Sequence, residues 1–148
     1  MKKQTKQLLI FALAILLVIG WAMWPRSLER LILKYHAAAD FSNIERFNVW
    51  WTPPDPVAYD VDSYPHWTLD EELTQPILHI LRKATVSRPT GDSRLVIGDE
   101  GVYDLSTWCF HLPITMRGEI QVWNSVYRLD QRSFDALWAI LTESNPER

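Results

Sequence analysis

Two groups of side chains in this sequence have the residue types and spacing that metal binding or covalent catalysis requires. The first group lies in one acidic stretch and comprises Asp55, Asp60, Asp62 and His66. Carboxylate oxygens and an imidazole nitrogen are ligands for divalent cations, but this stretch lacks the glycine and the closing acidic residue of a calcium-binding loop. We therefore expect these side chains to be hydrated on an exposed loop, without a bound metal or cofactor.

The second group is Cys109 and His111, which one residue separates. On a β-strand both side chains point to the same face, where a thiolate and an imidazole form a nucleophilic pair or half of a metal site. Trp108 and Phe110 then occupy the opposite face, and free cysteine is among the most buried residue types. A core position for Cys109 is the favoured interpretation. A small metal-dependent or cysteine hydrolase is the alternative function that these two groups leave open.

Aromatic residues between positions 41 and 67 favour binding over catalysis. Adjacent residues of an extended strand point to opposite faces, so Trp50 and Trp51 cannot both enter one core unless the backbone bends. Indole rings are enriched at protein interfaces because they offer a large contact area with few rotatable bonds. Local packing of the exposed tryptophan on the neighbouring prolines is the favoured explanation, and burial by a partner is the functional alternative. The predicted protein-binding surface comprises Trp50, Trp51, Tyr59, Tyr64 and Trp67.

An apolar run at the start of the chain, LLIFALAILLVIGWAMW, would hold all of these groups at a membrane. The run covers residues 8–24 without a formal charge, and as a helix it would reach roughly 25 Å at about 1.5 Å per residue. The bulky residues at its end do not form the small-residue cleavage site of a secretory signal peptide. We predict that residues 1–7 are a basic cytoplasmic tail and residues 8–24 a transmembrane signal anchor in contact with membrane lipid.

The orientation of this anchor depends on a small difference in charge. Lysines precede the run, while Arg26, Arg30 and Lys34 follow it, so the positive-inside rule gives nearly equal counts. A very short basic head before the first apolar helix is typical of a signal anchor. We therefore expect a single-pass protein of the bacterial inner membrane, with the C-terminal domain in the periplasm.

The charge of the remaining chain argues against nucleic acid as a partner. Three of the fifteen basic residues precede the apolar run, which leaves twelve of them against all eighteen acidic residues. Binding to a phosphate backbone requires a basic surface. The single cysteine cannot form an internal disulfide, so cysteine usage does not indicate a compartment.

The rest of the sequence alternates between helical and extended patterns. A stripe of Leu28, Leu31, Ile32 and Tyr35 predicts a juxtamembrane amphipathic helix within residues 25–40, with a break at Pro25. A second helix is predicted to start from a capping box at Thr68–Glu71 and to be kinked or interrupted at Pro76, and a last helix is predicted to be capped by Asp130. Strands are predicted at 49–51, 94–97, 102–105, 108–114, 118–123 and 126–129. The last two strands are joined by a predicted hairpin turn at Asn124-Ser125.

These elements predict an α+β protein. An N-terminal transmembrane helix precedes a soluble domain, residues 41–148, in which a four- or five-stranded antiparallel sheet packs against two or three helices. The favoured function is a non-enzymatic, membrane-anchored binding module that acts on another protein in the extracytoplasmic space, as an inhibitor, immunity factor or accessory subunit does. A third possibility is a structural anchor whose domain contacts lipid or a neighbouring membrane helix through residues 28–39.

Overall fold

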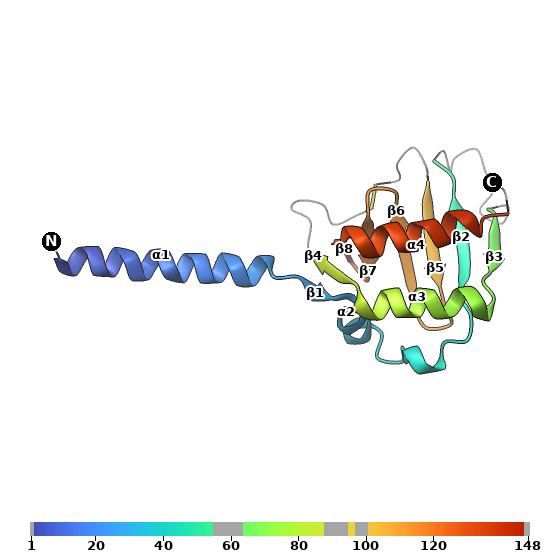
Figure 1. The fold of residues 1–148 in the computed structure, drawn as a ribbon, viewed down its shortest axis with the longest axis horizontal. Helices are drawn as coiled ribbons and strands as arrows, with labels where there is room; N and C mark the ends of the chain where they lie inside the picture. Colours follow the sequence, from blue (N-terminus) through green and yellow to red (C-terminus); the bar gives the residue numbers. More distant parts are fainter. Residues whose placement is uncertain (1, 55–63, 88–94, 97–100, 147–148) are drawn as a thin grey trace.

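The computed structural model describes residues 2–54, 64–87, 95–96 and 101–146. Helix α1 (Lys2–Met23) extends away from a domain in which three further helices pack with one sheet (Figure 1). Within the described ranges, Thr5–Ala22 is the one helical segment whose length and composition suffice to cross a membrane. Helix α1 ends before Pro25, and a new helix begins at Leu28, so the predicted break is confirmed.

The sheet has eight strands among the described residues, in the order β1-β4-β8-β7-β6-β5-β2-β3, and every pairing is antiparallel. The prediction of an antiparallel α+β domain is confirmed, whereas four or five strands was too few. Strands of two or three residues are too short to show an alternating pattern in the sequence. The elements are β1 (Arg26–Ser27), α2 (Leu28–Tyr35), the 3-10 helix η1 (Phe41–Asn43), β2 (Asn48–Thr52), β3 (His66–Thr68), α3 (Glu71–Lys83), β4 (Thr85–Ser87), β5 (Val102–Ser106), β6 (His111–Thr115), β7 (Glu119–Val122), β8 (Ser125–Leu129) and α4 (Gln131–Glu143).

The hydrophobic core lies on the side of the sheet that α3 and α4 cross (Figure 1). Val49 of β2 pairs with Leu105 of β5, which in turn pairs with Leu112 of β6, and all three side chains are fully buried. The last helix, α4, supplies Leu137 and Leu141 to this core. Helix α2 adds its own buried residues, which are Leu28, Leu31 and Ile32.

Helix α3 begins differently from the prediction. Its N-cap is Asp70, whose side chain accepts a hydrogen bond from the Leu73 amide at 2.9 Å. The predicted capping residue, Thr68, lies instead in β3 and donates its hydroxyl to Asn48 Oδ1 of β2 at 2.8 Å. The capping box was therefore wrong, because cross-strand pairing takes Thr68. Pro76 lies on an exposed position inside α3, which continues past it as one helix.

Two predicted strands change their bounds. The strand predicted at 108–114 begins only at His111, because Thr107 accepts hydrogen bonds from the amides of Cys109 and Phe110 and closes a turn. The hairpin loop lies one residue earlier than predicted, since Ser125 already pairs with Val122. The strand predicted at 94–97 has its ends outside the described residues, and its two described residues are not in a strand. Helix α2 ends at Tyr35, short of the predicted limit near residue 40.

The carboxylate of Asp130 ties the start of α4 to the sheet. It accepts one hydrogen bond from the Ser133 amide at 2.9 Å, as a helix cap, and another from the Thr85 amide of β4 at 2.8 Å. Burial acts to raise the pKa of Asp130, but the hydrogen bonds from Thr85 and Ser133 outweigh it and lower the pKa below its ordinary value of 3.8. The ionised carboxylate therefore stabilises the fold above that ordinary pKa, and this contribution is lost as the pH falls through the lower folded-state pKa.

We expect Asp130→Ala to lower the free energy of unfolding by about 1–2 kcal/mol, because α4 loses its cap and the Thr85 amide loses its acceptor. Urea denaturation of the detergent-solubilised chain at neutral pH measures this loss. The control is Asp135→Ala, which removes an exposed carboxylate whose hydrogen bond comes from Gln131 of the same helix, and we expect a change within about 0.5 kcal/mol. Equal losses in the two variants would contradict the role of Asp130.

Candidate functional site

The face of the sheet opposite α3 and α4 carries a row of polar and aromatic side chains. They alternate along their strands with the buried core residues, so they point to the other side. In this row His66 pairs with Trp50, Trp50 with Asp104, and Asp104 with Pro113. These side chains are exposed or half-buried. We call this surface the outer face and define it by Trp50, His66, Asp104, His111, Pro113 and Gln121.

Trp50 is the large aromatic residue of the outer face. Its ring lies parallel to that of His66, with centroids 4.4 Å apart and planes at 17°, yet 37% of the residue is exposed. His66 is held in turn near the Tyr64 carbonyl oxygen, 3.3 Å from its Nδ1. The stack therefore holds one face of the indole in place while part of Trp50 stays accessible.

The other predicted surface residues lie elsewhere. Trp51 points to the core side, as the alternation of the strand requires, and it is half-buried there. Trp67 is also half-buried on the core side, where its Nε1 donates to Ser144 Oγ at 3.1 Å and its ring meets the edge of Tyr103. These two indoles support the fold and do not belong to the outer face. Tyr64 is half-buried beside the start of β3, and Tyr59 lies outside the described residues.

The acidic group from the sequence is mostly outside the described residues. Asp55, Asp60 and Asp62 are not described, and the contacts of His66 are those with Trp50 and Tyr64. Within the described ranges, no three side chains of His, Cys, Asp or Glu are grouped so that they could hold a metal ion.

Cys109 and His111 do not share a strand face, so that prediction was wrong. Cys109 lies in the turn before β6, half-buried against the core, with its Sγ 3.3 Å from Thr107 Oγ1. His111 begins β6 on the outer face, where its Nδ1 lies 3.4 Å from Asp104 Oδ2. Sequence reasoning missed Asp104 because only the register of β5 on β6 brings it to His111, and no local motif marks the pair.

Asp104 is partly withdrawn from water. Its Oδ1 is buried and has no hydrogen-bond partner among the described residues. Burial raises the pKa of the Asp104 carboxyl above its ordinary value of 3.8, although the charge and hydrogen bond of His111 act to lower it. A carboxylate that orients an imidazole is one part of a nucleophilic site. The hydroxyl nearest in register, Ser106, is buried and donates to the Asn48 carbonyl at 3.2 Å, so it is not directed at His111.

A pocket of about 200 Å³ adjoins His111 on the outer face. Its walls also include Trp123 and His36. The Nε2 atom of His36 is buried and has no hydrogen-bond partner among the described residues. Small-molecule sites usually offer about 300–1,000 Å³, so this pocket has the size for a single side chain of a partner. A larger cleft of about 650 Å³ lies between residues 42–46 and the start of α3, and none of the predicted site residues lines it.

Comparison of the chain with protein-family models, with curated proteins and with solved structures found no match. We therefore infer function from the geometry of the outer face itself.

We expect Asp104→Asn to raise the free energy of unfolding at neutral pH, because the amide keeps a hydrogen-bond acceptor for His111 without the cost of burying a charge. A raised pKa means that the folded wild-type protein binds a proton more readily than the unfolded chain does. Wild-type stability should thus fall as the pH rises from 3.8 through the folded-state pKa of Asp104. Urea denaturation between pH 3.5 and pH 7, values set by this window, measures both proteins.

The gain from Asp104→Asn should be largest at neutral pH and should shrink as the pH falls. Glu143→Gln, an exposed carboxylate on α4, is the control and should show no such pH dependence. A stability difference between wild type and Asp104→Asn that is the same at all pH values would contradict a raised pKa for Asp104.

Proposed function

We propose that this chain is a non-enzymatic protein-binding module, held at a membrane by α1, that binds another protein in the extracytoplasmic space through the outer face. One observation carries the proposal: Trp50 is exposed on the sheet face opposite α3 and α4, and the His66 ring fixes its orientation. The chain would act on that protein as an inhibitor, an immunity factor or an accessory subunit does.

The composition of the outer face supports a protein as the ligand. Tryptophan is enriched among the few interface residues that carry most of the binding energy, and it is usually ringed by polar groups. Here Asp104 lies beside Trp50 on the neighbouring strand β5, and His111 and Gln121 follow on β6 and β7 of the same face.

The hydrolase remains the second candidate, and the contact between His111 and Asp104 is the observation in its favour. That pair would orient an imidazole as a general base. The described contacts supply no nucleophile for it, because Cys109 interacts with Thr107 and Ser106 donates to Asn48. Binding therefore accounts for more of the outer face than hydrolysis does.

The properties of α1 support a retained anchor. Its candidate span is not covered by the domain, so α1 is not a core helix of the described structure. Trp21 and Trp24 at its end are 77% and 72% exposed, and an indole at that position prefers the headgroup layer of a membrane. We assign the protein to the bacterial inner membrane as a single-pass protein, with the domain in the periplasm.

Photocrosslinking in native membranes tests the outer face. With benzoylphenylalanine at position 50 or 121, we expect one adduct of defined mass with a partner protein. The same amino acid at position 136, an exposed position on α4, should give none because α4 lies on the opposite side of the sheet. Adducts from position 136 alone would contradict the proposed surface.

Alanine substitution tests the energetic role of Trp50. We expect Trp50→Ala to weaken binding of the crosslinked partner by about 2 kcal/mol or more, roughly thirtyfold in Kd, as at other tryptophan anchors. The matched control is Trp108→Ala, since Trp108 is 71% exposed but lies in the turn before β6. Pull-down with purified partner measures both Kd values, and equal losses would refute an anchoring role for Trp50.

A reporter fusion tests the membrane assignment. Alkaline phosphatase joined after Arg148 is expected to be active, and the fusion should stay in the membrane after a carbonate wash at its full mass. An inactive fusion would show that the domain lies in the cytoplasm and would contradict the proposed orientation. A product shortened by cleavage near residue 24 would show that α1 is a signal peptide and not an anchor.

A further inference from the structure

We propose that the outer side of α2, together with Trp123, docks onto the lipid headgroup layer of the membrane that holds α1. This inference rests on the proposed anchoring by α1. The surface, which we call the α2 patch, comprises Arg30, Leu33, Lys34, Tyr35 and Trp123. It would fix the orientation of the domain on the membrane, which a flexible tether alone would not do.

The two sides of α2 differ sharply in burial. Leu28, Leu31 and Ile32 are buried against the domain, whereas Arg30, Leu33 and Lys34 are exposed. Leu33 lies between the two basic residues on the exposed side, and 40% of it is accessible. An amphipathic helix that lies in a membrane interface combines basic and apolar residues in this way.

Trp123 extends the patch from the hairpin between β7 and β8. It is 57% exposed, and its ring stacks parallel to that of Tyr35 with centroids 6.4 Å apart and planes at 6°. Lys34 Nζ lies 5.1 Å from the centroid of the same Tyr35 ring. Tryptophan and tyrosine are the side chains that concentrate at membrane–water interfaces.

The backbone of Trp123 has an unusual conformation, which supports a functional reason for a tryptophan at this position. Its φ is +56°, a backbone conformation that a bulky residue rarely adopts. The next residue, Asn124, is of the type that tolerates this conformation. The hairpin nevertheless places the tryptophan at the strained position, where its ring reaches Tyr35 and His36.

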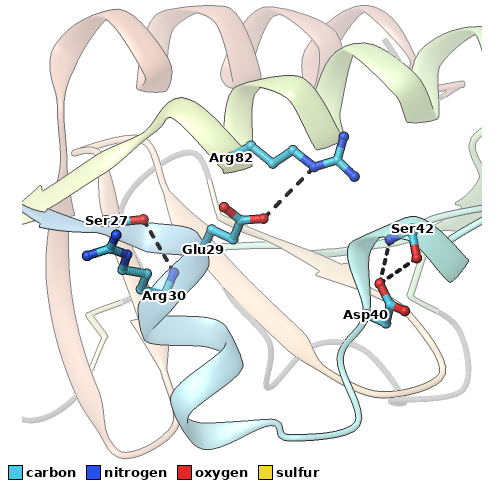
Figure 2. Close-up of polar contacts among 6 residues, drawn as sticks. All are labelled: Ser27, Glu29, Arg30, Asp40, Ser42 and Arg82. Atoms are coloured by element: carbon cyan, nitrogen blue, oxygen red, sulfur yellow. Dashed lines mark hydrogen bonds and ion pairs between the residues drawn. The ribbon is translucent and has the colours of Figure 1, made fainter.

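Charge favours lipid as the occupant of this patch. The acidic residue of α2, Glu29, turns toward α3 and lies 4.0 Å from Arg82 Nε, while Arg30 points the other way (Figure 2). Asp40, the next acidic residue, turns its carboxylate onto the amide and hydroxyl of Ser42, at 2.9 Å and 2.6 Å (Figure 2). Arg30 and Lys34 are thus exposed without an acidic partner on α2, where anionic lipid headgroups would attract them.

The short connection between α1 and α2 also favours lipid as the ligand of the α2 patch. Four residues, 24–27, separate the end of α1 at Met23 from the start of α2 at Leu28. A fully extended chain spans at most about 3.6 Å per residue, so α2 begins within roughly 18 Å of the end of the anchor. Ser27 caps α2 by accepting a hydrogen bond from the Arg30 amide at 3.3 Å, which keeps the helix start at this place (Figure 2).

Spin labelling of the full chain tests the docking. Single cysteines at positions 16, 33 and 136, in a Cys109→Ser background, carry the label in nanodiscs that hold one copy of the protein in mixed anionic and zwitterionic lipid. We expect the label at position 16 to collide with oxygen and not with an aqueous nickel chelate. The label at position 33 should be at least twofold less accessible to the chelate than the label at position 136.

Charge substitutions distinguish lipid docking from simple burial. Arg30→Gln with Lys34→Gln is expected to make position 33 as accessible as position 136, whereas the control Arg132→Gln on α4 should leave it unchanged. If position 16 is in lipid while position 33 matches position 136 in the chain that keeps Arg30 and Lys34, the docking is overturned and the anchor stands. If position 16 is in water, the anchor itself is wrong, and so is the docking that rests on it.

Discussion

The arrangement of this domain depends on the alternation of side chains along its strands. Helices α3 and α4 cover one face of the sheet, so the strands send most of their apolar side chains to that face. The alternation fixes Trp51 on the core side and Trp50 on the outer face one residue earlier. The outer face thus follows from the packing of the core, and a shift of one residue in β2 would exchange the two tryptophans.

The domain and the anchor are joined through α2, whose two sides have separate roles. Its buried side contributes Leu28 and Ile32 to the core, so the position of α2 on the domain is fixed by packing. Its exposed side carries Arg30 and Lys34 within a short reach of α1. In the account we propose, the membrane orients the domain through α2, and the outer face is left for the partner.

Sequence patterns predicted the parts of the fold that are long and locally determined. The apolar run, the last helix and its Asp130 cap each depend on residues within one segment. The short strands β1, β3 and β4 could not be predicted, because two or three residues show no period and are defined by their partners. The same limit applies to the site: alternation predicted that only one of Trp50 and Trp51 enters the core, but the contact between Asp104 and His111 depends on register.

The central claim is that a partner covers the outer face in the native membrane. Hydroxyl-radical footprinting compares the oxidation of Trp50 and Trp108 in native membranes and in the purified chain. The account predicts that Trp50 is protected in native membranes relative to the purified chain, while Trp108 is oxidised equally in both. Equal oxidation of Trp50 in the two preparations would contradict the claim.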